Sequence, residues 1–379
     1  MVTGTSPCLF APVRKLPDSK KSAFVGHPQQ KDALGIKKIR EKETWTYKTV
    51  VGEFPPSKRI HCYTSTSICE NVRFTSRTAE KAMQDRIKTA HFIDICGSDQ
   101  AGNNLQISTI WNLCETIDSF IENHPHSTIV ICPEHATSKS LSDACLLFGA
   151  YLILCRGVEL DDLLDGMKDI LEGIDQEPLS SSAELHPNVC VIDFWNSLLQ
   201  AKKLKWLGKM ITDDAEPLLD VEMAGHYALP INGNLHVLIP DKLLVLLSLA
   251  SLPDERDWAD HGDGRRHFSA RFLAALLADL GVSAVACLGR AGDGDAAAFR
   301  AHGLDVHELG LDPRRPALLP ALDRLLAVSR AAPGAVALYG GDAAGAGCVA
   351  TVVAAWLMRE CGFGEGAASA WVRMVCPGS

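Results

Sequence analysis

The chain has 379 residues, of which 47% are hydrophobic and 22% charged, with 37 Lys and Arg against 46 Asp and Glu. This length predicts two domains, and the hydrophobic content is enough to fill their cores. The composition excludes a collagen-like or wholly disordered chain. The longest uncharged apolar run, residues 144–155, is shorter than the roughly 18 residues that a membrane span needs. We therefore expect a soluble, intracellular protein with no membrane partner.

The net charge of −9 is unevenly distributed along the chain. Residues 1–88 carry 17 Lys and Arg against 8 Asp and Glu, a net charge of +9. The remaining 291 residues carry 20 against 38, a net charge of −18. A basic segment favours an acidic partner, whereas the acidic remainder of the chain disfavours nucleic acid.

Residues 1–88 are predicted to form a basic, irregular N-terminal arm, because their apolar residues are sparse and follow neither a helical nor a strand period. One short stretch, residues 75–89, has the pattern of a capped helix. The basic side chains of the arm that we expect to contact a partner are Arg14, Lys15, Lys20, Lys21, Lys37, Lys38, Arg40, Lys58 and Arg59.

The rest of the chain alternates between strand and helix patterns. In residues 89–209, strands are predicted at 90–97 and 127–134, and helices at 104–124, 140–157, 158–175 and 191–208. In residues 210–379, two strands are predicted within 233–250, further strands at 282–289, 304–311 and 335–341, and helices at 266–281, 295–303, 317–331, 348–362 and 364–379. This alternation predicts an α/β fold with a mainly parallel sheet flanked by helices.

The last strand–helix unit carries the main functional signal. A buried strand, AVALY (335–339), runs into the glycine-rich stretch GGDAAGAG (340–347) and then into a helix. Backbone N–H groups in such a turn, together with the helix dipole, favour a phosphate group. Cysteine-dependent phosphatases place a nucleophilic Cys and, six positions later, an Arg in a loop of this kind.

Around this loop the chain resembles the cell-division-cycle-fourteen group of dual-specificity phosphatases. The ending AWVRMVCPGS (370–379) is similar to the ending of that family, and GNLHVLIPDK (233–242) to the start of its catalytic domain. Residues 128–151 resemble the degenerate loop and helix of its non-catalytic first domain. The resemblance implies two tandem protein-tyrosine-phosphatase-like domains, residues 89–209 and 210–379.

The catalytic signature of the family is missing from this chain. Carried over residue by residue, the His-Cys of the family falls on Tyr339 and Gly340, and its loop Arg falls on Ala346. Asp342 adds a negative charge that would repel phosphate. Asp312 falls at the general-acid position of the family, but we favour the interpretation that it caps the following helix, with Pro313 at the first helical position. We therefore expect no catalytic residues and an inactive phosphatase fold.

No metal or cofactor is expected. The 13 cysteines are odd in number and form no Cys-x-x-Cys pair, so the chain lacks the closely spaced ligands of a structural zinc site. In the absence of a secretory signal, reduced and mostly buried thiols are predicted.

Three functions remain open at this point. The favoured hypothesis is a scaffold protein that docks through its arm to a large acidic assembly, most readily tubulin in the microtubules of a cilium, axoneme or spindle, because the resembled family is linked to spindle, centrosome and cilium. The alternatives are a phosphopeptide-binding pseudophosphatase and a phosphatase that uses unconventional residues, with Asp312 as its acid.

Overall fold

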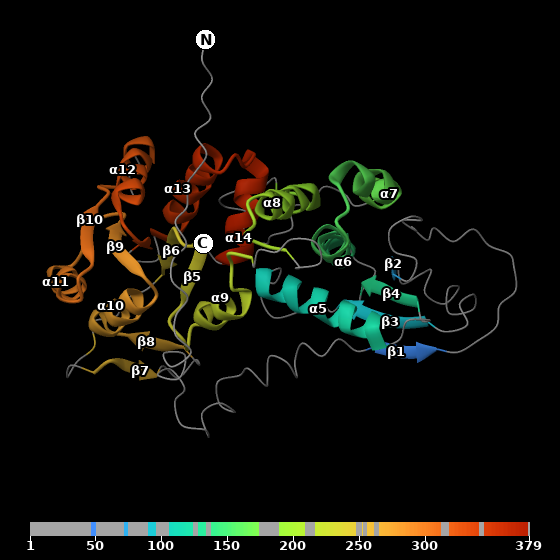
Figure 1. Ribbon diagram of the computed structural model, residues 1–379, viewed down its shortest axis with the longest axis horizontal. Coiled ribbons are helices and arrows are strands. Elements are labelled where there is room, and N and C mark those ends of the chain that lie inside the picture. Colours follow the sequence, from blue (N-terminus) through green and yellow to red (C-terminus); the bar gives the residue numbers. More distant parts are fainter. Residues whose placement is uncertain are drawn as a thin grey trace, which may run out of the picture.

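A computed structural model describes the chain over residues 47–50, 72–74, 90–95, 106–123, 128–133, 138–173, 189–208, 217–247, 252, 256–260, 265–311, 318–340 and 345–377. The described residues form two halves, each with its own main sheet (Figure 1). The first half ends at residue 208, and the second begins at residue 217. None of the helices in these ranges is long and apolar enough to cross a membrane.

The second half is built on a five-stranded sheet. Its strands are β5 (Leu235–Ile239), β6 (Leu243–Leu246), β9 (Val282–Cys287), β10 (Asp305–Glu308) and β11 (Ala335–Tyr339). They lie in the order β10-β9-β11-β6-β5, and all neighbours are parallel except β5 and β6. The prediction of an α/β fold with a mainly parallel sheet is confirmed for this half.

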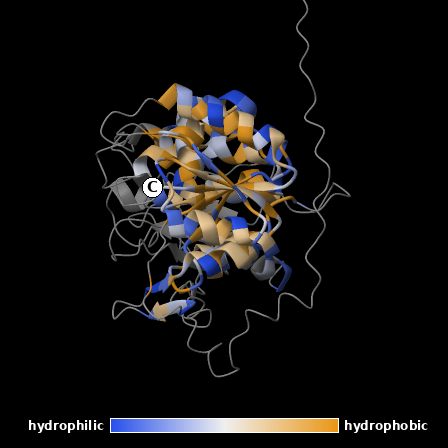
Figure 2. Cartoon of the chain, turned by 90° about the vertical axis from the view of Figure 1, so that its left-hand side faces the viewer, coloured by the Kyte–Doolittle hydropathy of each residue, from blue (hydrophilic) through white to orange (hydrophobic). Residues whose placement is uncertain are grey.

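Helices cover both faces of this sheet. One face is covered by α10 (Ala270–Asp279) and α11 (Asp293–Ala301), and the other by α12 (Leu318–Ala331), α13 (Gly345–Glu360) and α14 (Glu365–Val375) (Figure 1). Figure 2 shows the hydrophobic strands between these two helical layers. Along β11, Ala337 joins the core on the α10 side and Leu338 the core on the α12 side, as the two-residue period of a strand requires.

The first half contains a four-stranded sheet. Its strands are β1 (Tyr47–Val50), β2 (Val72–Phe74), β3 (Ala90–Ile95) and β4 (Thr128–Pro133), in the order β1-β3-β4-β2. Only β1 is antiparallel to its neighbour. The helices are α5 (Ile107–Asn123), α6 (Ser138–Tyr151), α7 (Leu160–Gly173) and α8 (Val191–Lys203).

Two strands lie within the predicted irregular arm. The prediction that residues 1–88 are irregular is wrong for β1 and β2, which pair with β3 and β4. These partners are distant in the chain, and no local pattern announces such pairing. The predicted helix at 75–89 lies mostly outside the described residues, and the division into an arm and two domains stays a prediction.

Three further elements differ from the sequence predictions. The helix expected from residue 266 begins at Ala270, because Ser269 caps it by accepting a hydrogen bond of 3.2 Å from the Phe272 N–H. The residues before it form β8 (Arg266–Phe268), which pairs with β7 (Trp258–Asp260) in an antiparallel hairpin. A short helix, α9 (Val221–Ala228), was not predicted. The helix that begins with α6 ends at Gly157, as predicted, where φ is +70°. Its last five residues before Gly157, Leu152–Arg156, form a π-helical turn.

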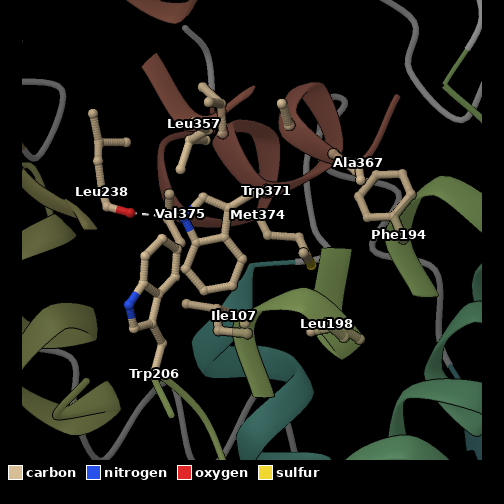
Figure 3. Packing of buried hydrophobic residues seen from close by; sticks show 14 of the residues in the cluster. Ile107, Phe194, Leu198, Trp206, Leu238, Leu357, Ala367, Trp371, Met374 and Val375 are labelled. Atoms are coloured by element: carbon tan, nitrogen blue, oxygen red, sulfur yellow. Dashed lines mark hydrogen bonds between the residues drawn. The ribbon is translucent and has the colours of Figure 1, made fainter. Parts of the chain in front are cut away.

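A continuous hydrophobic core connects the two halves. It extends from α5, α6 and α8 of the first half to β5, β6, α13 and α14 of the second. Figure 3 shows its centre, where Trp371 of α14 lies among Trp206, Leu198 and Ile107 of the first half. The helices of the first half and the five-stranded sheet therefore share one core.

Candidate functional site

The carboxyl ends of the parallel strands form one edge of the five-stranded sheet, which we call the carboxyl edge. β9 and β11 are neighbours within this sheet. The helices that follow them, α11 and α13, lie on opposite faces (Figure 1). In open α/β sheets, ligands bind outside the carboxyl ends of the strands at such a switch point. Topology and sequence therefore indicate the same candidate site, the loop after β11.

Strand pairing fixes the position of Tyr339 at the start of this loop. Tyr339 ends β11 and is the register partner of Cys287, which ends β9. Its carbonyl oxygen accepts a hydrogen bond of 3.0 Å from the Leu288 N–H, and its side chain packs against the core beneath α10 and α11. Gly340 follows and is half-buried. Tyr339 thus packs against the core at the position where the resembled family has the His that precedes its nucleophilic Cys.

The other positions of the candidate site are only partly described. Ala346 lies in the first turn of α13. Asp342 and Asp312 lie outside the described residues. No geometry therefore joins Asp312 to the loop, and its predicted role as an acid or a cap stays a prediction.

The predicted partner-binding side chains lie outside the described residues as well, and their role stays a prediction. They are Arg14, Lys15, Lys20, Lys21, Lys37, Lys38, Arg40, Lys58 and Arg59.

A cysteine is present at the carboxyl edge, but its surroundings suppress the thiolate. The Cys287 side chain is buried, with 1% of its surface exposed. Burial, followed by the negative charges of Glu308 and Asp295, raises the pKa of the thiol to about 11, against a smaller opposing effect of Arg300. Burial also raises the pKa of the Asp295 carboxyl above its usual range. Reactive cysteines instead lie in exposed, electropositive surroundings that lower the pKa. Cys287 is therefore a protonated packing residue at neutral pH.

Backbone hydrogen bonds hold the turns of the carboxyl edge together. The Leu309 N–H donates to the Cys287 carbonyl oxygen at 2.7 Å, and the Leu311 N–H donates to that of Leu288 at 2.6 Å. Arg324 of α12 reaches across and donates to the Leu309 carbonyl oxygen at 2.7 Å. Gly310 lies at φ +66°, and a Cβ there would collide with the Arg324 guanidinium. The turns after β9 and β10 are thus fixed by packing and leave little freedom for rearrangement.

Within the described residues, no group of three or more His, Cys, Asp or Glu side chains could hold a metal ion. None of the eight cysteines whose side chains the structure describes forms a disulfide bond. Five of them are buried, as the sequence predicted: Cys114, Cys145, Cys155, Cys287 and Cys376.

Sequence reasoning missed a buried polar cluster in the first half. The Tyr151 hydroxyl donates to Asp118 Oδ1 at 3.0 Å and accepts a hydrogen bond of 2.8 Å from Arg156 Nε. Arg156 Nη2 also lies 3.3 Å from Asp118 Oδ1, which makes a largely buried ion pair. The cluster ties α5 to the end of α6. Tyr151 follows Asp118 by 33 residues and Arg156 follows it by 38, so no short sequence motif could have predicted this cluster.

Comparison with known proteins adds no relative. The chain matches no protein-family model and no curated protein. The function of this fold therefore has to be argued from its own residues.

Proposed function

We propose that this protein is a catalytically inactive, phosphatase-like scaffold that docks to a large acidic assembly through its basic arm. In this proposal, residues 89–209 and 210–379 are two tandem phosphatase-like domains, and residues 1–88 are the arm. The assembly that we favour is the microtubule lattice of a cilium, axoneme or spindle. The protein would then be part of the cytoskeleton.

The observation that carries the proposal is the composition of the loop after β11. This loop follows the strand next to β9 at the switch point of the sheet, where phosphate chemistry would be expected. Residues 340–347 nevertheless contain no Cys and no Arg. Without a thiolate no phosphocysteine can form, and without the Arg no planar, two-pronged grip on the phosphoryl oxygens exists.

The cysteine at the end of β9 does not replace the missing nucleophile. The raised pKa of Cys287 keeps it as a thiol at neutral pH, and its side chain is covered by the core beneath α10 and α11. The neighbouring Glu308 and Asp295 are negative and would repel a phosphate dianion. These features support a fold that has kept its shape without the groups that the reaction needs.

Charge segregation supports a polymeric acidic partner. A segment with a net charge of +9 precedes a remainder with −18. The acidic remainder would be repelled by an acidic polymer, so attraction has to come from the arm. Such binding should weaken as the salt concentration rises, because exposed charges are screened.

Co-sedimentation with taxol-stabilised microtubules tests this proposal. Since β1 and β2 contribute to the first sheet, charge neutralisation in the full chain is a cleaner test than deletion of the arm. The variant carries Lys37→Gln, Lys38→Gln, Arg40→Gln, Lys58→Gln and Arg59→Gln. We expect its affinity to fall by at least about tenfold, with a weaker dependence on salt.

The control neutralises two exposed arginines of the second half, Arg290→Gln and Arg300→Gln. This control should bind microtubules like the wild type. Equal losses in both variants, or no loss in the arm variant, would show that the arm does not carry the interaction.

Phosphatase activity is tested separately with an aryl phosphate. We expect no turnover above the uncatalysed rate. Clear turnover that is abolished by Asp312→Asn would overturn the inactive assignment and favour the unconventional phosphatase. Calorimetric titration with a phosphopeptide addresses the remaining alternative, and we expect no heat of binding because Asp342 repels the phosphate.

A further inference from the structure

The last helix, α14, belongs to the second half in the sequence but also packs against the first half. α14 follows the five-stranded sheet, yet it contacts α8 of the first half as well as α13 and β5 of its own half. Figure 1 shows α14 between the two halves. We infer that α14 acts as a clasp that joins the halves into one cooperative folding unit, a property that does not depend on the proposed function. We call the contact between α8, its continuation to Trp206, and residues 361–375 the seam.

Aromatic side chains from both halves meet in the seam. Trp371 of α14 is fully buried, and its indole N–H donates a hydrogen bond of 2.7 Å to the Leu238 carbonyl oxygen of β5 (Figure 3). Its ring lies 5.3 Å from that of Trp206, which follows α8. Trp206 in turn stacks on Phe363 at 5.7 Å. Separating the halves would expose these rings to water, at a cost that grows with their apolar area.

Polar contacts fix the alignment of the same helices. Gln200 of α8 donates from Nε2 to the Cys361 carbonyl oxygen at 2.7 Å. At the other end of the seam, a Cβ on Gly366 of α14 would collide with the carboxylate of Asp193. Asp193 cannot turn away cheaply, because its Oδ2 accepts a hydrogen bond of 2.9 Å from the Cys190 N–H as part of a capping box. The close approach of α14 to α8 therefore requires glycine at position 366.

Within the described residues the halves also touch where the Leu218 and Leu219 N–H groups donate to the Lys205 and Trp206 carbonyl oxygens at 3.0 Å, and where α9 lies against α5. A Cβ on Gly225 of α9 would lie 3.1 Å from Cβ of Ser108 on α5. This contact involves a helix of only eight residues. Cooperation between the two main sheets should consequently depend chiefly on α14.

Native-state hydrogen exchange in urea tests the clasp in the full chain. In the wild type, amides of α6 and α8 and amides of β9 and β11 should lose protection at the same urea concentration. In Gly366→Ala, the added methyl group displaces α14 from α8. The urea concentrations at which the two sets of amides lose protection should then differ by about 0.5 M or more. Gly364→Ala is the matched control, because a Cβ there meets no atom within 4 Å. It should behave like the wild type.

A second variant keeps the test decisive if Gly366→Ala does not fold. Gln200→Ala removes the hydrogen bond to Cys361 without adding bulk. The urea concentrations at which the two sets of amides lose protection should differ in this variant too, but by less than in Gly366→Ala. The inference is overturned if the wild-type halves lose protection in separate steps. It is also overturned if the folded seam variants become less stable while both sets of amides still open together.

Discussion

The carboxyl edge lies within the second half, whereas the seam joins the two halves, and the two regions have opposite chemical character. At the carboxyl edge, the loop after β11 contains no Cys and no Arg, and the thiol of Cys287 is buried near carboxylates. At the seam, the indole of Trp371 is fully buried and hydrogen-bonded, and Gly366 has no room for a methyl group. Residues of the seam are buried and packed so closely that little else would fit, whereas the carboxyl edge holds no accessible reactive group among the described residues. The following predictions test this difference between the carboxyl edge and the seam.

The largest effect should follow from truncating the seam. Trp371→Ala removes a fully buried indole and leaves the Leu238 carbonyl oxygen without its donor. We expect the free energy of unfolding to fall by about 3–5 kcal/mol, as measured by urea denaturation. Trp258→Ala is the control, because Trp258 is 47% exposed and meets Phe272 edge-on. It should cost about 1 kcal/mol or less. Similar costs for both variants would contradict a specifically packed seam.

A pH-dependent effect should follow from the buried His236 of β5. Its Nδ1 donates to the Val375 carbonyl oxygen of α14 at 3.0 Å, and burial lowers the pKa of the imidazole from 6.5 to about 4. The unfolded chain therefore takes up this proton first as the pH falls. Stability from this group is complete above about pH 6.5 and is lost towards pH 4, by roughly 3 kcal/mol in total.

His236→Gln isolates this contribution. Gln cannot titrate, so the fall in unfolding free energy between pH 7 and pH 4 should be smaller than in the wild type by roughly 3 kcal/mol. His307→Gln is the control, because it replaces an exposed histidine. An unchanged pH dependence in His236→Gln would show that the imidazole is not buried as a neutral group.

A smaller loss is expected where α6 meets α8 in the first half. A Cβ on Gly149 would collide with the indole of Trp195, which is fully buried and donates to the Leu146 carbonyl oxygen at 3.2 Å. Gly149→Ala should therefore destabilise the protein by about 1–3 kcal/mol in urea denaturation. Gly166→Ala in α7 meets no atom within 4 Å and should stabilise by roughly 0.5–1 kcal/mol. A stabilising Gly149→Ala would contradict this packing.

Local pattern was sufficient for most of the fold. Apart from α9, β7 and β8, the order of strands and helices from β3 to α14 follows from apolar periodicity, and the helix ends at Gly157 and Gly281 follow from their left-handed backbone. Pairing between distant segments was not predictable in this way. β1 and β2 depend on β3 and β4, and the hairpin of β7 and β8 replaced the start of an expected helix.

The candidate site was predictable in position but not in environment. The glycine-rich stretch after AVALY marked the loop after β11, and the missing Cys and Arg were readable directly. The raised pKa of Cys287 could not be predicted from the sequence, because it depends on burial and on Glu308 of β10 and Asp295 of α11, which only the fold brings near. The seam was hidden for the same reason, since Gly366 and Asp193 are far apart in the chain.

The smallest expected effect concerns the thiol at the carboxyl edge. With a pKa of about 11, roughly three in ten thousand Cys287 thiols are ionised at pH 7.5, and burial blocks access to them. Brief treatment of the native protein with iodoacetamide should therefore leave Cys287 unmodified by peptide mass spectrometry, while the partly exposed Cys348 and Cys361 are alkylated. In urea all three should react. Rapid alkylation of native Cys287 would mean that the carboxyl edge holds an accessible thiolate. The contrast with the seam would then fail, because a reactive group would remain where we infer that only shape has been kept.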